Sequence, residues 1–323
     1  MRQEHIKFLI CPTCKQKLTP ATTRSENAEI IEGTLSCGRH TFPVTKGVAV
    51  FTPEQNSTGI NFGYEWNKFT SFFAEYEHQF LDWIFPVQKE FFKQKIIFDA
   101  GCGNGRHAFL AGNFGAKLVF AVDISNAVFP AKKLCKNLPN VEVIKADITQ
   151  LPFNNETFDY TYSIGVLHHL SEPKKGFSAI IDKTKKNGVI SAWVYGQENN
   201  FTLRLLNPLR RLVFRNTPKT FNYALSFLIA SLLHPIIHLY GILHKLQFSN
   251  KLTKYIPQYH LFVYFSKLPF HVTHNTVFDQ MSAPIAHYLK RSELEFWRQE
   301  NNLKNFLVTW RNKNSWRIYA VKS

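Results

Sequence analysis

The chain has 323 residues, 45% hydrophobic and 19% charged, which fits a globular chain with a sizeable core and room for two domains. Its formal net charge of +16 favours an anionic partner such as nucleic acid, a membrane surface or an acidic substrate. An odd number of cysteines, five, argues against a disulfide framework. The N-terminal stretch MRQEHIKFLICPTCKQKL lacks the apolar core of a secretory signal, so we expect a cytoplasmic protein with reduced thiols.

The first fifty residues contain a metal-ligand pattern. CPTCKQKL carries Cys11 and Cys14, and LSCGRHTFPV carries Cys37 and His40 at the same spacing, 22 residues further on. Two such turns bring three thiolates and one imidazole into the tetrahedron of a closed structural zinc site. The alternative is a redox-active CxxC beside an unrelated Cys and His. We expect a zinc-ribbon domain over residues 1–52 that depends on its metal for stability.

The stretches LICPTCKQKL and GTLSCGRHTFPVTKGVAVF resemble the small zinc-binding activator proteins that partner tRNA, rRNA and release-factor methyltransferases. The resemblance covers residues 7–52. The fourth ligand in that family is usually cysteine, whereas this chain has His40 in its place. The resemblance implies that the domain after the ribbon transfers methyl groups.

Three aspartates close three successive apolar runs. Asp99 ends the run in IIFDAGCGNG, Asp123 the run in KLVFAVDIS and Asp147 the run in VEVIKADITQLPF, each 24 residues after the one before. Each interval has room for a strand, a helix and short loops, so the pattern predicts βαβ units of a parallel sheet. Ligands of such sheets bind beyond the carboxyl ends of the strands, where all three aspartates fall.

Two ligands compete for this edge of the sheet. GNGRHA, residues 103–108, fits the G-x-G-x-x-A pattern of dinucleotide sites, and Asp123 would suit a ribose. A fixed carboxylate opposes a diphosphate at a helix N-terminus, however, and Asp99 precedes Gly101 by only two residues. The carboxylates instead suit a ligand with an amine, a ribose diol and an adenine amino group. S-adenosylmethionine (SAM) meets that description, and NAD is the weaker alternative.

Residues 60–200 and 279–323 resemble the class I SAM-dependent methyltransferases. The matching features are D-x-G-x-G-x-G, the two downstream aspartates, FDYTYSIGVLHHL, a helix at SELEFWRQENNL and a closing hairpin that turns at NKNS. The resemblance implies an α/β, Rossmann-like sheet of seven strands with an antiparallel last hairpin, in a domain over residues 96–323. The implied cofactor-binding residues are Asp99, Gly101, Cys102, Gly103 and Gly105 for the methionine portion, Asp123 and Ile124 for the ribose and adenine, Asp147 and Ile148 for the adenine, and the carbonyl of Ser163 for the ammonium.

Residues 53–95 form the predicted connecting lid. In FGYEWNKF, Tyr64 or Trp66 would lay a ring near the sulfonium for a cation–π contact, and a core-packing amphipathic helix is the equal alternative. Methyl transfer depends mainly on orientation, and a general base is needed only when the acceptor must lose a proton. His168 and Tyr195 are the candidate catalytic residues, with His169 behind them, and simple loop packing is the alternative.

A long basic insertion, residues 199–278, follows the fifth predicted strand. It contains no acidic side chain, and its nine basic residues are Arg204, Arg210, Arg211, Arg215, Lys219, Lys245, Lys251, Lys254 and Lys267. The charge-free stretch of residues 221–244 contains Pro235, so we expect two helices in an apolar hairpin over the ligand end of the sheet. An interfacial lid on an anionic membrane, at the inner face, is favoured over a buried cap or a transmembrane span.

The predicted function is methyl transfer to a small, amphiphilic or lipophilic acceptor. An RNA (tRNA or rRNA) methyltransferase is the alternative, because positive charge and the ribbon's resemblance suit it. The aromatic residues of the insertion, however, fall in apolar runs without interleaved Lys and Arg, unlike a base-stacking platform. A non-catalytic scaffold is disfavoured because every expected cofactor position is filled.

Overall fold

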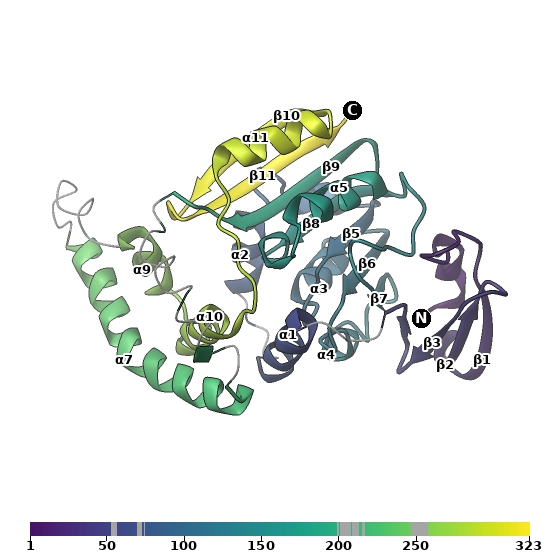
Figure 1. Cartoon of the computed structure of the whole chain (residues 1–323), viewed down its shortest axis with the longest axis horizontal. Helices are drawn as coiled ribbons and strands as arrows, with labels where there is room; N and C mark the ends of the chain where they lie inside the picture. Colours follow the sequence, from purple (N-terminus) through teal and green to yellow (C-terminus); the bar gives the residue numbers. More distant parts are fainter. Residues whose placement is uncertain are drawn as a thin grey trace.

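The computed structural model describes residues 1–52, 57–69, 73, 75–198, 200, 208, 213–214, 217–246 and 258–323. At its centre, seven of eleven strands lie in the order β7-β6-β5-β8-β9-β11-β10 (Figure 1). These strands are β5 Ile96–Ala100, β6 Leu118–Asp123, β7 Val141–Lys145, β8 Phe158–Ile164, β9 Thr184–Tyr195, β10 Leu303–Arg311 and β11 Ser315–Lys322. The first five are parallel, and β11 is antiparallel to β9 and β10, which confirms the predicted fold class.

The order of the strands reverses beside β5. The chain moves outward from β5 through β6 to β7, then returns to place β8 on the other side of β5. In register, Ile97 lies opposite Val119 of β6 and Tyr160 of β8. Parallel sheets bind their ligands at such a reversal, beyond the carboxyl ends of the strands. The fold therefore places the predicted glycine turn, which follows β5, at the usual ligand-binding edge.

Helices cover both faces of the parallel sheet. One face carries α2 Glu75–Trp83, α3 Arg106–Asn113 and α4 Val128–Leu134, and the other carries α5 Pro173–Lys183 and α11 Arg291–Glu300. Two short 3-10 turns are η2 Lys89–Phe92 and η3 Leu167–His169. Because successive strand side chains alternate, Ile97 packs with the first group, whereas Phe98 packs with the second. Both faces are buried, as the continuous apolar runs of β5 and β6 require.

The N-terminal ribbon is joined to this sheet rather than tethered beside it. Its elements are η1 Gln3–Phe8, β1 Thr19–Glu26, β2 Glu29–Ser36, β3 Thr41–Thr45 and β4 Val48–Val50. Strand β4 pairs parallel with β7, where Ala49 lies opposite Ile144. Buried Glu142 accepts hydrogen bonds from the Arg2 amide and from His5 Nδ1, both at 2.8 Å. The ribbon thus extends the sheet at its β7 edge.

Residues 221–244 of the insertion lie in one long helix instead of the predicted hairpin of two. Its described helices are α7 Lys219–Lys245, α9 Tyr259–Phe265 and α10 Phe270–Ser282. The expected break at Pro235 is wrong, because α7 runs through it for 27 residues. Proline removes one amide donor and crowds the carbonyl one turn earlier, but contacts with α9 and α10 along its length hold α7 together.

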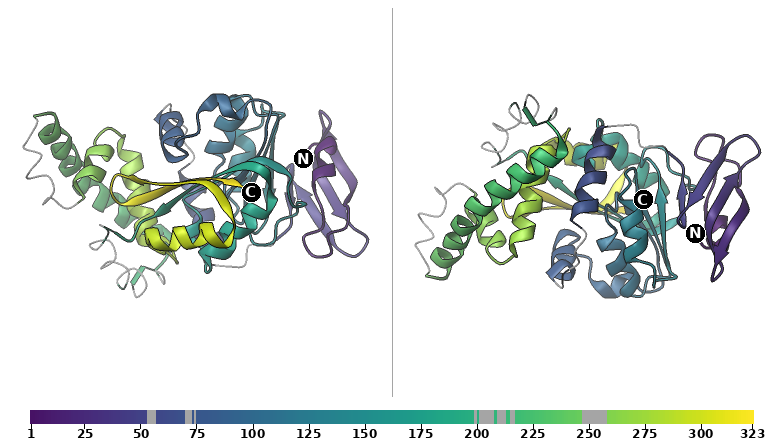
Figure 2. Two further views of the ribbon diagram at one scale, coloured as in Figure 1. Left: turned by 90° about the horizontal axis from the view of Figure 1, so that it is seen from above. Right: turned by 90° about the horizontal axis from the view of Figure 1, so that it is seen from below.

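The ribbon and the insertion lie at opposite ends of the molecule. The views from the front, above and below all show the central sheet between them (Figures 1 and 2). Six of the nine predicted basic residues of the insertion lie outside the described residues, and these are Arg204, Arg210, Arg211, Arg215, Lys251 and Lys254. Helix α1 Ser57–Lys68 lies between the end of the sheet and α10, to which Glu65 is bonded.

Candidate active site

The turn after β5 is held open by glycines. Gly101 and Gly105 have φ values of 90° and 83°, in the left-handed region that glycine adopts without strain. A Cβ atom on Gly101 would lie 2.3 Å from the Val166 side chain, and one on Gly105 would lie 2.8 Å from the Ala131 side chain. The amides of Gly101 and Cys102 donate to the Val122 carbonyl, at 2.8 and 2.9 Å. The glycines therefore leave the backbone of the turn without side chains that would keep a ligand away from it.

Asp123 fastens the turn to the next strand. Its Oδ2 accepts the Gly103 amide at 2.8 Å, and its Oδ1 accepts the Ser125 amide at 2.9 Å. Burial raises the pKa of the Asp123 carboxyl despite these hydrogen bonds. Each carboxylate oxygen can accept a second hydrogen bond, so the residue can hold the loop and still receive hydroxyl groups. The predicted ribose contact is compatible with this arrangement and stays a prediction.

Asp99 is a buried carboxyl near the end of β5. Its side chain is 1% exposed, and neither carboxylate oxygen has a hydrogen-bond partner within 3.5 Å in the described part of the chain. Burial raises its pKa to about 8, against the opposing influence of the Tyr162 hydroxyl. An uncompensated buried carboxyl at the glycine turn suits a cationic group, because a nearby positive charge would offset the desolvation of its ionised form.

The other predicted cofactor residues have structural partners of their own. Asp147 Oδ1 accepts both the amide and the hydroxyl of Thr149, at 2.8 and 2.7 Å, and so shapes its own turn. Ile148 is buried in the core, whereas Ile124 is half-buried at the end of β6. Ser163 Oγ donates to the Ala100 carbonyl at 2.8 Å and ties β8 to β5. Their contacts with adenine and ammonium remain predictions.

Helix α1 separates the two aromatic candidates. Trp66 covers the turn, since a Cβ atom on Gly103 would lie 3.0 Å from the Trp66 Nε1 atom. Its ring already carries a cation, because the Arg106 guanidinium lies 5.1 Å from its centre. Tyr64 instead lines a hollow of about 460 Å³ between α1 and Asn126, just beyond β6. Of the two residues, only Trp66 has a described contact with the glycine turn.

The two predicted catalytic residues lie together. Tyr195 ends β9, and its ring centre is 3.9 Å from that of His168, which follows β8 in η3. The Tyr195 hydroxyl donates to Asp279 Oδ2 at 2.8 Å and accepts from Gln280 Nε2 at 3.1 Å. Burial, with Asp279 next, raises the Tyr195 pKa well above its ordinary value. Tyr195 therefore stays protonated and is suited to positioning rather than to accepting a proton.

His169 packs beside this pair, with its ring centre 4.2 Å from that of His168 and 5.7 Å from that of Tyr195. Its Nδ1 lies 2.6 Å from the Ile285 carbonyl, and its ring lies 4.9 Å from that of Phe62 in α1. It thus connects η3 with both α1 and the segment after α10. This agrees with the packing alternative for His169, and His168 is the better-placed residue for chemistry.

An acidic pair near Tyr195, the buried Glu65 and the half-buried Asp279, has no counterpart among the predicted residues. Glu65 of α1 is 1% exposed, and its Oε1 accepts from Asn275 Nδ2 of α10 at 2.8 Å. Burial, followed by the neighbouring Asp279, raises the pKa of Glu65 well above its ordinary value. One oxygen of each carboxyl, Glu65 Oε2 and Asp279 Oδ1, is buried without a hydrogen-bond partner among the described residues. In the sequence, Glu65 lies within FGYEWNKF, the stretch discussed for its aromatic residues, but nothing there connects it with Asp279.

Taken together, these residues fit SAM at the ligand edge of the sheet. Glycines leave the turn without side chains, Asp99 is a buried carboxyl whose ionised form a cation would stabilise, and Asp123 retains acceptor capacity. When bound, SAM supplies a methyl group on a sulfonium that a nucleophile attacks in line. The chain itself supplies the orienting contacts and the cover of α1, which together exclude water.

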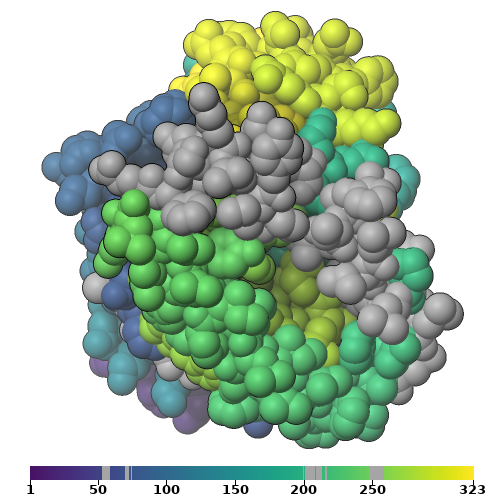
Figure 3. Space-filling model, turned by 90° about the vertical axis from the view of Figure 1, so that its left-hand side faces the viewer, coloured from purple at the N-terminus to yellow at the C-terminus, as the bar shows by residue number. Residues whose placement is uncertain are grey.

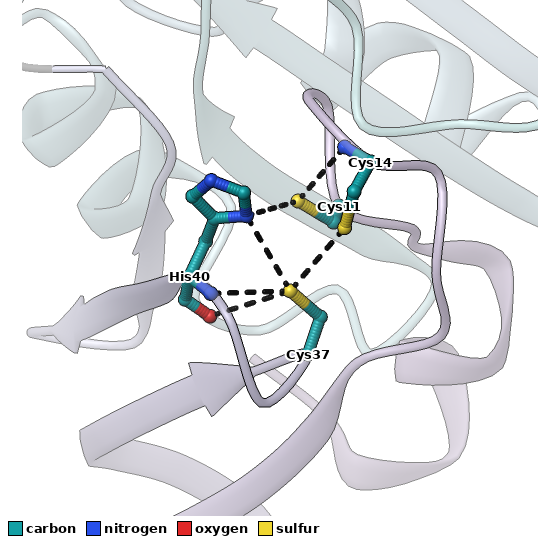
Figure 4. A group of neighbouring side chains, drawn as sticks. All are labelled: Cys11, Cys14, Cys37 and His40. Atoms are coloured by element: carbon teal, nitrogen blue, oxygen red, sulfur yellow. Dashed lines mark hydrogen bonds between the residues drawn. The ribbon is translucent and has the colours of Figure 1, made fainter.

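The four predicted metal ligands converge in the ribbon (Figure 4). Their ligand atoms all lie within 4.8 Å of one another, with Cys14 Sγ and Cys37 Sγ 3.5 Å apart and His40 Nδ1 3.5 Å from Cys11 Sγ. A tetrahedron with metal–sulfur distances of about 2.3 Å has edges of roughly 3.8 Å, close to these separations. The cluster therefore fits a structural zinc site.

The backbone around the cluster favours thiolate. The His40 amide donates to Cys37 Sγ at 3.3 Å, and the Cys14 amide donates to Cys11 Sγ at 3.5 Å. Burial opposes ionisation of Cys37, but amide hydrogen bonds from Arg39 and His40 outweigh it and lower its pKa to about 6. Thiolate is the form that binds zinc.

Comparison with known proteins points to the same chemistry. Residues 98–192 match the family model of a methyltransferase domain. A tRNA (carboxymethyluridine(34)-5-O)-methyltransferase of Arabidopsis thaliana is 35% identical over 119 residues, which are 35% of this chain and 28% of that protein. A tRNA U34 carboxymethyltransferase of Ruthia magnifica is 32% identical over 100 residues, 30% of this chain and 31% of that protein. The chain thus spans about a third of the length of these curated relatives.

Solved structures with similar folds are more distant in sequence. A SAM-dependent methyltransferase from Aquifex aeolicus is 15% identical, with a TM-score of 0.46, over 81% of this chain and 98% of that one. Magnesium protoporphyrin IX methyltransferase from Synechocystis PCC 6803 with bound S-adenosylhomocysteine (SAH) is 14% identical, with a TM-score of 0.46, over 80% of this chain and 94% of that one. The matched residues 98–192 contain the glycine turn, Asp123 and β6 to β8. The chain therefore carries a SAM-dependent methyltransferase domain built on the class I sheet.

Proposed function

We propose that the chain transfers a methyl group from SAM to a small amphiphilic acceptor, bound where α1 and α10 meet above the end of β9. The observation that carries this proposal is the acidic pair Glu65 and Asp279, whose two buried oxygens have no partner among the described residues. Apolar rings border the pair, with Tyr64 and Phe278 5.9 Å apart. A site that combines apolar rings with hydrogen-bonding oxygens suits an acceptor that has both an apolar part and a polar group.

The acidic pair offers both kinds of hydrogen-bonding group. Burial and the neighbouring Asp279 raise the pKa of Glu65, so Glu65 keeps its proton and can donate a hydrogen bond. Asp279 accepts from Tyr195 and has a second oxygen for the acceptor. In this proposal the acceptor's polar group bonds to Asp279, and His168 receives the proton that the acceptor loses. Tyr195 holds the Asp279 carboxylate in place.

A radiolabelled-methyl transfer assay on cell extract, divided into lipid, RNA, protein and small-molecule fractions, tests the acceptor class. We expect label in the lipid or small-molecule fraction. The variant Asp279→Asn should lower kcat/KM for that acceptor at least tenfold, because it removes a charged acceptor of hydrogen bonds, and should leave SAH affinity unchanged. Asp182→Asn, on the exposed side of α5, is the matched control. Full activity in Asp279→Asn would refute the acceptor site.

RNA methylation is the second candidate function. The net charge of +16 favours it, and the curated relatives named above act on tRNA according to their names. The same fractionated assay separates the two functions. Label confined to the RNA fraction would replace the amphiphilic acceptor with RNA.

We further propose that the cluster of Cys11, Cys14, Cys37 and His40 holds a structural zinc ion. All four positions are used by protein ligands, which leaves no open coordination site for catalysis. The buried residues of the ribbon continue into the core of the sheet, and few apolar side chains are its own, so zinc would supply much of its stability. Metal analysis of the purified protein should find one zinc per chain.

A further inference from the structure

Helix α7 exposes a continuous apolar stripe. Its members recur at spacings of three, four and seven residues, which puts them on one side of the helix. They are Phe221, Leu228, Leu232, Ile236, Leu239, Ile242 and, at the C-cap, Leu246, each between 49% and 70% exposed. The helix has 27 residues and is about 40 Å long, so the stripe runs along one whole side of the insertion. Figure 3 shows α7 crossing this end of the molecule.

The opposite side of α7 is directed into the protein and combines the apolar Ala230 and Ile237 with several polar side chains. Ser226 Oγ lies 3.0 Å from His274 Nε2 of α10, and His234 Nδ1 lies 3.1 Å from Thr273 Oγ1. Asn222 is fully buried and donates to the Phe214 carbonyl at 3.0 Å. A surface helix of a water-soluble domain normally has the reverse arrangement, with its apolar stripe facing the core. Helix α7 is therefore built for an apolar neighbour on its outer side.

Charge indicates what that neighbour is. The acid-free region of residues 199–278 carries nine basic side chains, two of which, Lys219 and Lys245, are the first and last residues of α7. An anionic surface is attracted to such a region, at about 1 kcal/mol for each nearby Lys or Arg. A second copy of this chain would bring the same positive charge to the contact and would be repelled.

The polar side chains on the inner side of α7 also determine how the helix can contact a bilayer. The helix is long and apolar enough to cross a membrane, with a mean hydropathy of 1.7 over its most apolar window. A span would expose Asn222, Ser226 and His234 to lipid or would need the whole insertion to enter the bilayer. A helix that lies in the interface keeps these groups against α9 and α10 and buries only its outer stripe.

We propose that the α7 stripe docks in the interfacial layer of an anionic lipid bilayer, with the helix parallel to the membrane plane. This docking would place the protein at the cytoplasmic leaflet and bring α10, which carries Asp279, close to the lipid. Beside α7, the surface is hollowed, with residues of the α10 region at its floor (Figure 3). The inference goes beyond the proposed function and stands without it, because it depends only on α7 and its surroundings.

Co-sedimentation of the full chain with lipid vesicles tests the proposal. Vesicles of phosphatidylcholine alone are compared with vesicles of equal parts phosphatidylcholine and phosphatidylglycerol. We expect at least tenfold stronger binding to the anionic vesicles, and weaker binding as salt is added. Equal or no binding to the two kinds of vesicle would overturn the proposal.

A double variant identifies the docking surface. Leu232→Gln with Leu239→Gln should reduce binding to anionic vesicles at least tenfold. Phe296→Gln, a 51% exposed apolar side chain on α11, is the matched control and should bind as the wild type does. Unchanged SAH binding verifies that both variants are folded, and it also separates this test from that of methyl transfer. Undiminished vesicle binding by the double variant would overturn the proposal.

Two further outcomes would also refute it. Wild-type protein that resists extraction from membranes by alkaline carbonate would indicate a transmembrane span. Wild-type dimers in gel filtration that dissociate in the double variant, without vesicle binding, would indicate that the stripe binds a second copy.

Discussion

At one end of the molecule, the ribbon turns four ligand side chains toward one another, whereas at the other end α7 turns its apolar side chains away from the protein. The ribbon needs a partner inside its own fold, because a single metal ion would bind all four ligand side chains. The apolar stripe of α7 needs a partner outside the protein, since only another apolar surface can cover it. The methyltransferase domain lies between them, and the buried Asp99 carboxyl is one of its groups without a hydrogen-bond partner among the described residues. In each region, the side chains that lack a partner indicate which kind of ligand or surface would bind there.

Removal of metal should give the largest effect and tests the ribbon side of the comparison. Structural zinc sites of this type contribute about 10 kcal/mol or more of binding free energy, which the metal-free ribbon would lose. We expect Cys14→Ser, or a strong chelator, to remove zinc and to unfold β1 to β4. Circular dichroism and metal analysis measure both changes.

The choice of cysteine provides the control for this prediction. Cys135→Ala alters a buried cysteine outside the cluster and should retain one zinc per chain, and His40→Cys should also retain it. Metal-free protein with an unchanged spectrum and melting temperature would show that the ribbon is held by its own contacts, such as those of Glu142.

Loss of the Asp123 carboxylate should have the next largest effect, at the centre of the molecule. Asp123→Ala removes two accepted amide hydrogen bonds and the proposed ribose contacts, so SAH should bind about 100-fold more weakly. Isothermal titration calorimetry measures the change, with Asp182→Ala as control. Zinc-stripped protein and the α7 double variant should both bind SAH normally if the two ends act independently of the centre. Normal affinity in Asp123→Ala would remove the ribose assignment.

The sequence could predict what depends on local pattern. The CxxC and CxxH turns and the aspartates near the ends of β5 and β6 are short motifs whose position in the chain fixes their position in the fold. It could not predict the pairing of Glu65 with Asp279, because these residues are far apart in the chain and meet only through the packing of α1 on α10. Pro235 misled the prediction because tertiary contacts outweighed its local preference.

The exposed apolar stripe and the buried polar side chains of α7 predict unusual effects on stability. Ser226→Val removes a buried hydrogen bond to His274 and should lower the free energy of unfolding by about 1–3 kcal/mol. Leu232→Gln, on the outer stripe, should change it by less than about 0.5 kcal/mol. Urea denaturation in the absence of lipid measures both. A larger loss of stability in Leu232→Gln than in Ser226→Val would mean that α7 packs its apolar side against the protein as an ordinary amphipathic helix does. The stripe would then need no outside partner.

A final prediction concerns the Asp99 proton and tests whether a cation completes the central site. Its folded pKa of about 8 lies above the ordinary value, so the free protein holds the proton at neutral pH, and the stability that this group contributes is lost as pH rises through 8. A bound ammonium would favour the ionised carboxylate. SAH binding near pH 6 should therefore release about one proton, and its affinity should rise about tenfold per pH unit until it levels off near pH 8.

Calorimetry in buffers of different ionisation enthalpy measures this proton release directly. Asp99→Asn cannot ionise, so its SAH affinity should be lower and independent of pH over the same range, whereas Asp147→Asn should keep the wild-type pH dependence. Proton release that persists in Asp99→Asn would assign the titration to another group. Wild-type affinity without any pH dependence would mean that Asp99 stays protonated in the complex and binds its ligand as a neutral hydrogen-bond donor, so the site would be completed by shape and hydrogen bonds rather than by opposite charge.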